Sequence, residues 1–250
     1  MPTRPIALIT GASRGIGAAT AHRLARDGYQ LCVNYRRDQQ AAEGVANQII
    51  AQGGQALAVQ ADISDEAEVM ALFAAIDQRL GPLDALVNNT GILQPQMRLD
   101  QMDGARVGAV LATNVIGTLL CCREAVRRMS TRHGGRGGAI VNLSSIAARL
   151  GAPHEYVDYA ASKGAVDSLT LGLSKEVAAE GIRVNAVRPG IIDTGIHASG
   201  GEPDRVARLG PLLPMGRGGR ADEVAAAILW LLSDQASYVT GSFIDAGGGR

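Results

Sequence analysis

The sequence has few cysteines and few aromatic residues. Its 250 residues include three cysteines, and aromatic side chains make up 3% of the chain. Cys121 and Cys122 are adjacent, which disfavours a structural disulfide between them, and no metal-ligand spacing is present. We therefore expect free thiols in the core, no metal, and a reduced, cytoplasmic setting.

An excess of charge and long apolar runs are also lacking. The 24 basic and 24 acidic residues cancel, so the chain has no basic footprint for nucleic acid or an anionic membrane. The first apolar run is too short for a signal peptide, and no stretch approaches the length of a membrane span. We therefore expect neither nucleic-acid nor membrane partners.

The chain is instead rich in glycine and aliphatic side chains, with 32 glycines and 46% hydrophobic residues. Short apolar runs without internal alternation predict strands that are covered on both faces. The predicted strands are residues 6–10, 29–35, 56–60, 83–88, 139–143, 182–187 and 242–245. The predicted helices are residues 16–27, 41–52, 65–80, about 100–131, 156–180 and 221–233.

Strands that alternate with helices predict right-handed crossovers and a parallel sheet. The expected fold is α/β: a single-domain, doubly wound (Rossmann) parallel sheet of about seven strands, with helices on both faces, over residues 1–250. The one long irregular stretch, residues 190–220, is rich in glycine and proline. Such a stretch inside a compact domain is typical of a substrate lid.

A glycine-rich turn at residues 10–17 joins the first predicted strand to the first helix. Its spacing is G-x-x-x-G-x-G, which lets the backbone approach a pyrophosphate over the N–H groups of the helix start. The second strand ends in Tyr35-Arg36-Arg37 rather than in an acidic residue. Arginine there, helped by Arg14 from the turn, pairs with a ribose 2′-phosphate. NADP is therefore the expected cofactor, with NAD as the alternative.

Tyr159 and Lys163 lie four residues apart in a predicted helix, so they share one face. A nearby ammonium favours the phenolate and lowers the tyrosine pKa, which suits the phenol to proton transfer with a carbonyl or alcohol. Ser145 follows the strand at residues 139–143, at the edge where doubly wound sheets bind ligands. Its hydroxyl, or that of Ser144, can bind a substrate oxygen or cap the following turn.

These motifs together resemble the classical short-chain dehydrogenase/reductase superfamily, in its glucose dehydrogenase-like or 3-oxoacyl-thioester reductase-like branch. The matching positions, in the family's order, are residues 10–17, Asp62, residues 88–91 (Asn-Asn-Thr-Gly), Asn114, Ser145, Tyr159, Lys163 and residues 189–190 (Pro-Gly). They span nearly the whole chain.

The resemblance implies a catalytic set of four residues. Tyr159 is the expected general acid/base, and Lys163 lowers its pKa and binds the nicotinamide ribose. Ser145 orients the substrate, and Asn114 holds a water in a proton relay, although a helix kink is its alternative role. The implied cofactor contacts are Gly11, Ser13, Arg14, Gly15, Ile16, Gly17, Tyr35, Arg36, Arg37, Asp62, Ile63, Asn89, Gly91, Lys163, Pro189, Gly190, Ile192 and Thr194.

Substrate contacts are expected from the loops that border the site. The candidates are Gln94, His154, Tyr156 and His197, and both histidines also fit as ordinary loop residues. The expected function is hydride transfer between nicotinamide and a small carbonyl or alcohol, with a sugar or a 3-oxoacyl thioester as candidate substrates. A catalytically silent NADP(H)-sensing or scaffold protein is the alternative. The resemblance also implies a homotetramer.

Two departures from the family pattern stand out. Thr90 occupies a position where the family usually has alanine, which adds a hydroxyl beside the cofactor. The spacing from Ser145 to Tyr159 is one residue longer than is common in the family. The extra residue is expected in the loop at residues 151–157, on the substrate side.

Overall fold

The computed structural model describes residues 4–250, so the first three residues of the predicted domain lie outside the described part. Seven parallel strands form one sheet in the order β3-β2-β1-β4-β5-β6-β9, which confirms the predicted doubly wound topology. The strands are β1 (Ile6–Ile9), β2 (Gln30–Tyr35), β3 (Gln55–Gln60), β4 (Ala85–Asn88), β5 (Gly138–Leu143), β6 (Ile182–Pro189) and β9 (Phe243–Ala246).

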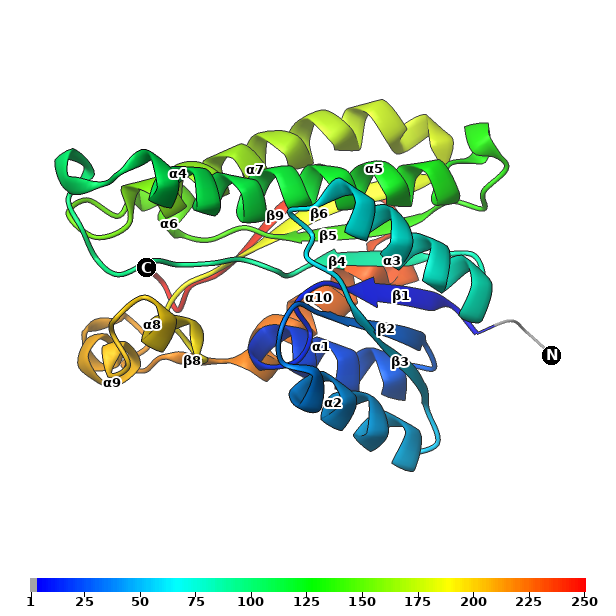
Figure 1. The fold of residues 1–250 in the computed structure, drawn as a ribbon, viewed down its shortest axis with the longest axis horizontal. Helices are drawn as coiled ribbons and strands as arrows, with labels where there is room; N and C mark the ends of the chain where they lie inside the picture. The colour runs from blue at the N-terminus through cyan, green and yellow to red at the C-terminus, as the bar shows by residue number, and fades with distance from the viewer. Residues whose placement is uncertain (1–3) are drawn as a thin grey trace.

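Helices cover both faces of this sheet (Figure 1). One face packs against α1 (Gly15–Arg26), α2 (Gln39–Ala51) and α10 (Ala221–Leu232). The other face packs against α3 (Glu66–Arg79), α5 (Gly117–Met129) and α7 (Val157–Val177). All three cysteines are buried free thiols, and burial raises the pKa of Cys32 and of Cys122 to about 12.

The strand order reverses between β1 and β4. The chain continues from β1 to β2 on one side and from β4 to β5 on the other, so the loops at the carboxyl ends of β1 and β4 diverge. Such a switch point opens a crevice in which α/β proteins bind ligands. The glycine-rich turn follows β1 directly and lies at this point.

The predicted long helix at residues 100–131 is interrupted. It consists of α4 (Gly104–Leu111), a π-helical turn (Ala112–Ile116) and α5. The continuous stretch Gly104–Met129 is long and apolar enough to cross a membrane, so the expectation that no stretch approaches that length is wrong. Core helices of globular proteins pass the same test, and 39% of its most apolar window is buried inside the protein.

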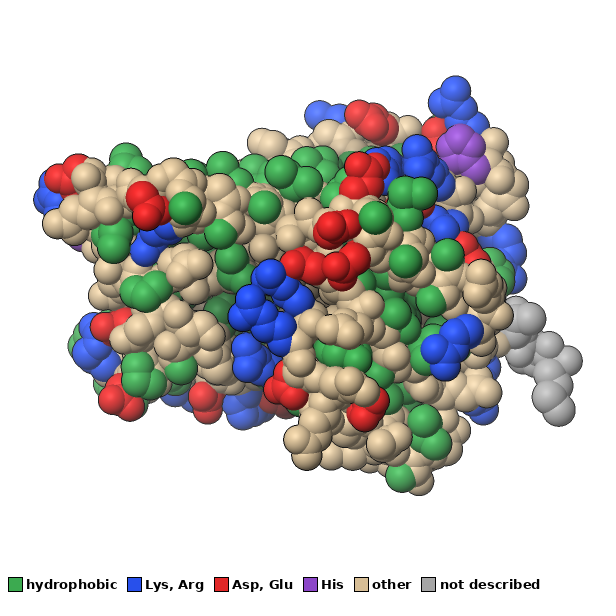
Figure 2. Space-filling model, viewed as in Figure 1, with side chains coloured by type: hydrophobic (Ala, Val, Ile, Leu, Met, Phe, Trp, Pro, Cys, Tyr) green, Lys and Arg blue, Asp and Glu red, His purple; other side chains and the backbone are tan. Residues whose placement is uncertain are grey.

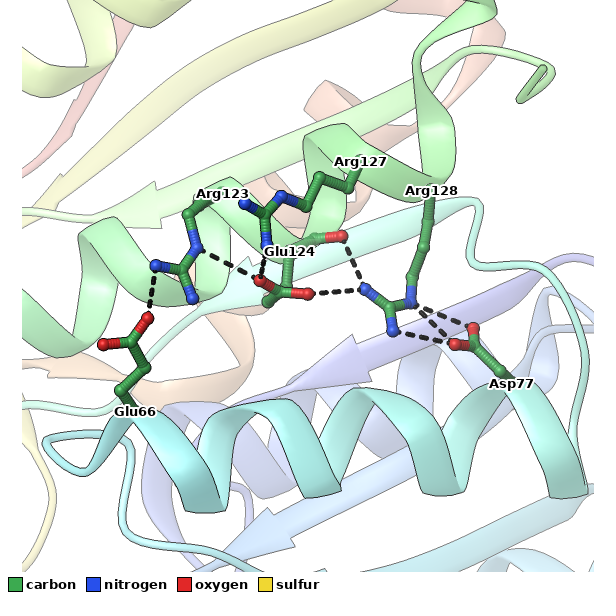
Figure 3. A network of polar contacts seen from close by, with 6 residues as sticks. All are labelled: Glu66, Asp77, Arg123, Glu124, Arg127 and Arg128. Carbon is green, nitrogen blue, oxygen red and sulfur yellow. Dashed lines mark hydrogen bonds and ion pairs between the residues drawn. The ribbon is translucent and has the colours of Figure 1, made fainter. Parts of the chain in front are cut away.

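A buried carboxylate holds α5 against α3 (Figure 3). Glu124 is 5% exposed and pairs with Arg123, Arg127 and Arg128 of its own helix. Two of these arginines continue to α3, because Arg123 reaches Glu66 at 2.6 Å and Arg128 reaches Asp77 at 2.8 Å. A chain of charges thus links two helices on one face of the sheet.

The stretch at residues 190–220, expected to be irregular, contains short ordered elements. These are β7 (Ile192–Asp193), α8 (Ile196–Ser199), α9 (Arg205–Leu209), a 3-10 turn (Gly210–Leu212) and β8 (Gly219–Arg220), with β7 and β8 paired in a small parallel ribbon. They lie beyond the carboxyl ends of the main strands (Figure 1). A further short helix, α6 (Ala147–Leu150), follows β5. The remaining 3-10 turns are Leu99–Gln101, Thr131–His133, Ala178–Glu180 and Asp234–Ala236.

Candidate active site

A cavity of about 1100 Å³ opens at the carboxyl ends of the strands. Its wall combines the glycine-rich turn, the ends of β2 to β5, the start of α7 and the segment that follows β6. All the predicted cofactor residues except Gly17 contribute to this wall, as do the predicted catalytic residues Ser145, Tyr159 and Lys163.

Glycine is required in the turn for two physical reasons. Gly11 and Gly15 have φ of +60° and +58°, a backbone region that disfavours side chains. Gly17 lies behind the wall, where an added Cβ would lie 2.6 Å from Asn89 Nδ2. That amide donates to the carbonyls of Thr10 and Gly11, each at 2.9 Å, so Gly17 lets α1 pack closely against the turn.

The start of α1 is suited to an anion. It has no side-chain cap and no acidic residue in its first turn, so its free N–H groups and positive dipole end meet the cavity wall at Gly15 and Ile16. Nearby, the Thr90 hydroxyl is buried without a hydrogen-bond partner in the described structure. These features fit the pyrophosphate and ribose of a dinucleotide, whose oxygens accept hydrogen bonds.

The predicted adenosine end contains three arginines and one acidic partner. Arg36 forms an ion pair with Asp62 at 2.6 Å, whereas Arg14 and Arg37 form no ion pair within residues 4–250. Figure 2 shows basic side chains gathered in the middle of one face, where α1 and α2 begin in Figure 1. This end of the cavity therefore carries positive charge that is only partly neutralised.

Ser145 and Tyr159 lie together at the nicotinamide end predicted for the cavity. Burial raises the pKa of the Tyr159 phenol above its ordinary value, and a hydrogen bond with Ser145 opposes the rise without cancelling it. Ser144 is a poorer candidate for contact with substrate, because its hydroxyl is buried and donates to the Lys163 carbonyl at 3.2 Å. The geometry therefore favours Ser145 over Ser144 as the hydroxyl available to a ligand.

Lys163 is buried beside Tyr159 on α7. Its Nζ donates to the Leu143 carbonyl at 2.6 Å and lies 5.7 Å from the centre of the Tyr159 ring. Burial lowers the pKa of Lys163 itself to about 8, against a smaller raising effect of Asp167. The side chain is therefore still mostly protonated at pH 7.

Asn114 lies in the π-helical turn and is fully buried behind the cavity wall. Its side-chain oxygen accepts from the Ile92 N–H at 2.8 Å, and its amide donates to the Ile92 carbonyl and to Ser162 Oγ. An added Cβ on Gly91 would lie 3.7 Å from Asn114 Oδ1 and 3.4 Å from Lys163 Nζ. Asn114 thus fixes the segment after β4 beside Lys163, and π turns of this kind are frequent at functional sites.

Three of the four predicted substrate residues line the cavity: Gln94, Tyr156 and His197. His154 does not line it and is exposed, with φ of +63°, although its neighbours Pro153 and Glu155 do line the cavity. His197 is buried, with Nε2 2.9 Å from the Ile192 carbonyl and Nδ1 unpaired in the described structure. Burial lowers its pKa, so the ring is neutral at pH 7.

Glu155 and Arg205 are among the wall residues that were not predicted as site residues from the sequence. Arg205 is 5% exposed and pairs with Glu155 at 2.5 Å. The two residues are 50 positions apart, so no local spacing connects them. Arg205 is one of several charged residues in the segment at residues 190–220, so the sequence neither singles it out nor identifies its partner.

Comparison with known proteins places this geometry among oxidoreductases. The family model described as enoyl-(acyl carrier protein) reductase matches residues 11–250. The uncharacterized oxidoreductase YgfF of Escherichia coli is 63% identical over 98% of this chain and 99% of its own. The 3beta-hydroxysteroid dehydrogenase 1 of Eggerthella lenta is 42% identical over 96% of this chain and 92% of its own.

A solved structure agrees with the fold over almost the full length. A short-chain type dehydrogenase/reductase from Mycobacterium marinum superposes with a TM-score of 0.91 and 35% identity, covering 98% of this chain and 94% of its own.

Proposed function

The chain belongs to the short-chain dehydrogenase/reductase family, and from that membership we propose that it moves a hydride between NADP and a small carbonyl or alcohol, with Tyr159 as general acid/base. Members of the family are NAD(P)-dependent oxidoreductases, and this protein is one of them. The preference for NADP, the substrate class and the roles of individual residues are the proposal.

The observation that carries the proposal is the shared cavity. Ser145, Tyr159 and Lys163 line the same space as the glycine-rich turn at the start of α1. A dinucleotide whose phosphates lie at the helix start can therefore extend toward the Tyr159 hydroxyl within one continuous volume. Bound nicotinamide supplies or accepts the hydride, and the chain supplies binding, orientation and the proton.

The proton step follows from the state of Tyr159. A raised pKa keeps the phenol protonated at neutral pH, and that is the form able to donate a proton to a carbonyl oxygen as it becomes an alcohol. Ser145, hydrogen-bonded to the phenol, orients the same oxygen. Lys163 binds the nicotinamide ribose beside Tyr159, and Asn114 holds the segment after β4 in place and supports a water relay.

The preference for NADP is supported by the basic adenosine end. Arg14 and Arg37 carry charges without ion-pair partners in the described structure. Arg36 would contact a 2′-phosphate while it also remains paired with Asp62. A phosphate held by arginine gains charge-assisted hydrogen bonds that a 2′-hydroxyl does not provide. NAD remains the alternative cofactor.

The substrate end of the cavity is bordered by the segment at residues 190–220, which we propose as the substrate lid. Gln94, Tyr156 and His197 give this end a few polar groups among apolar neighbours such as Leu93 and Ile191. A sugar and a 3-oxoacyl thioester are both candidate substrates.

We further propose a cytoplasmic homotetramer. Apolar side chains Leu111, Ile116 and Leu119 on the α4–α5 helix and Leu171 on α7 are each at least 38% exposed. Leu119 also lines a groove between α5 and α7, whose wall combines apolar residues such as Leu169 and Leu173 with charged side chains. A second copy of the chain that covers this face would remove them from water.

The test is a direct assay of the purified protein. NADPH oxidation is followed with a panel of ketones, aldoses and acyl thioesters, and NADPH and NADH affinities are measured by fluorescence titration. Turnover of at least one carbonyl, together with tighter binding of NADPH, is expected. Tight NADPH binding without any turnover would contradict the proposal and favour a redox-sensing or scaffold role.

A further inference from the structure

Three segments that are distant in the sequence meet at the substrate end of the cavity. They are the stretch after β4 around residues 93–97, the loop at residues 151–157 before α7, and the lid from α8 to α9. Arg205 of α9 joins the last two, because its guanidinium contacts both carboxylate oxygens of Glu155, at 2.5 and 3.4 Å. This two-bond geometry fixes the direction of both side chains.

Tyr156 forms a second link between the same two walls. The Arg205 guanidinium lies 5.3 Å from the centre of the Tyr156 ring, and the Tyr156 hydroxyl donates to the Gly200 carbonyl at 3.2 Å. Gly200 belongs to the turn that ends α8. Arg205 and Tyr156 are 5% and 4% exposed, so these links lie inside the protein and not on its surface.

The segment around residues 93–97 packs against the same contacts of Tyr156 and Glu155. A Cβ at Gly200 would lie 2.7 Å from Leu93 Cδ2 and 3.2 Å from the Tyr156 hydroxyl, so the lid turn approaches as closely as its backbone allows. The Met97 N–H donates to the Glu155 carbonyl at 3.0 Å. Glu155 therefore connects all three segments, through its backbone on one side and its carboxylate on the other.

The loop that carries Glu155 is held in an uncommon conformation. Ala152 and His154 have φ of +45° and +63° although neither is glycine, and such positions persist only where the surroundings enforce them. The ion pair to Arg205 and the hydrogen bond from Met97 are among the contacts that hold this loop in place.

We propose that Glu155, Tyr156 and Arg205 form a clasp that selects the substrate: it admits free carbonyl compounds small enough to be enclosed beneath the lid, and it discriminates against 3-oxoacyl chains still tethered to a carrier. The proposal rests on the proposed hydride-transfer function. The lid and the loop at residues 151–157 both line the substrate end of the cavity, and a tether that leaves the reacting carbon on this side passes between them. The clasp crosses that gap, so a tethered substrate has to break it and a free one does not.

The test compares two substrates with the same reacting group. Methyl acetoacetate and acetoacetyl-coenzyme A are reduced with NADPH, and the ratio of their kcat/KM values measures discrimination against the tether. Wild type is expected to favour the free ester. Glu155→Gln and Arg205→Leu are expected to lower that ratio by about tenfold or more, the scale on which binding sites commonly discriminate.

The exchanged variant Glu155→Arg/Arg205→Glu is the matched control. It keeps an ion pair across the gap, so it is expected to recover most of the wild-type ratio. If Arg205 instead bound the substrate directly, the exchange would remove that contact and the ratio would not recover. Amide hydrogen exchange gives a readout independent of activity: Glu155→Gln is expected to speed exchange in residues 196–209 and leave β1 unchanged.

Several results would overturn the clasp. They are a wild-type preference for acetoacetyl-coenzyme A, an unchanged ratio in both single variants, or no recovery in the exchanged variant. Any of these can occur while NADPH binding and turnover persist, so the proposed function would stand. Failure of wild type to oxidise NADPH with any carbonyl would remove the proposed function itself.

Discussion

Lys163 is unusual among the residues of this site, since a lysine side chain seldom lies wholly inside a protein. Its ammonium is buried and donates to the Leu143 carbonyl at the end of β5. The same contact places it beside Tyr159. The site therefore holds a charge whose burial costs stability. The charge lies where both the phenol of Tyr159 and the ribose of a bound cofactor would contact it.

The cost of burying Lys163 should appear in the pH dependence of stability. Its pKa is about 8 in the folded protein, against an ordinary value of 10.5. Between these values the unfolded chain binds more protons, so the free energy of unfolding rises with pH. Relative to Lys163→Met, wild type should gain on the order of 3 kcal/mol from pH 8 to above pH 10.5, with the cost of burial present in full below pH 8. Urea unfolding of both proteins across this range measures it, and a difference that does not change with pH would contradict the burial.

Arg37 should contribute to the choice of dinucleotide. Arg37→Ala is expected to weaken NADPH binding about tenfold or more, the scale of a charge-assisted hydrogen bond, and to leave NADH binding unchanged. The measurement is fluorescence titration with both dinucleotides. Arg26→Ala, which removes an exposed arginine from the far end of α1, is the control for net charge. An equal loss for NADPH and NADH would show that Arg37 does not read the 2′-phosphate.

The sequence was sufficient to place Tyr159, Lys163 and Ser145 near one another, because helix spacing and the end of a parallel strand are local features. It was not sufficient to predict their protonation. The raised pKa of Tyr159 and the lowered pKa of Lys163 depend on how completely neighbouring segments exclude water. The Arg36–Asp62 and Arg205–Glu155 ion pairs could likewise not be predicted from the sequence, since each joins residues that are far apart along the chain.

At the scale of elements, the contact between α3 and α5 depends on one buried acid. Burial by itself raises the pKa of Glu124, but hydrogen bonds from Arg128 and Arg123 outweigh it and leave the pKa below its ordinary value. A buried carboxylate with three arginine partners is costly to neutralise, because the arginines then lose their counter-charge.

Glu124→Gln should therefore destabilise the protein by about 3 kcal/mol or more at pH 7, a typical cost of breaking a buried ion pair. Because the folded pKa is lowered, the stabilisation is present above the ordinary carboxyl pKa and is lost as pH falls below it. Chemical denaturation at neutral and acidic pH measures both effects. Glu43→Gln, on the exposed face of α2 with only Gln39 as partner, is the control. Equal stability of the two variants would contradict the role assigned to Glu124.

Most elements were predicted within a few residues, since buried strands and amphipathic helices leave strong patterns. The π-helical turn at Ala112–Ile116 was not predicted, because one extra residue per turn barely alters the apolar periodicity. The short elements of residues 190–220 were also missed. α8, α9 and the β7–β8 ribbon are too short to leave a pattern of their own, and contacts with distant loops hold them.

At the scale of the whole molecule, the helices α4, α5 and α7 form one side of the protein (Figure 1) and leave apolar side chains exposed there. Light scattering should therefore give a mass well above the 25.9 kDa of one chain, consistent with a homotetramer. Leu119→Glu, which introduces a charge into the exposed apolar face, should halve the assembly or dissociate it. A monomeric wild type, or a variant with unchanged mass, would contradict the proposed interface.

The central claim is that Tyr159 gives the proton that accompanies hydride transfer. Tyr159→Phe keeps the ring and removes the hydroxyl, so NADPH affinity should stay within about twofold while the single-turnover rate of carbonyl reduction falls by a factor of about 100 or more, the scale of general acid catalysis. The decisive measurement is that rate, at saturating NADPH and with the most active carbonyl of the panel. Loss of reduction with NADPH still bound is the predicted result. Reduction at the wild-type rate by Tyr159→Phe would contradict the account.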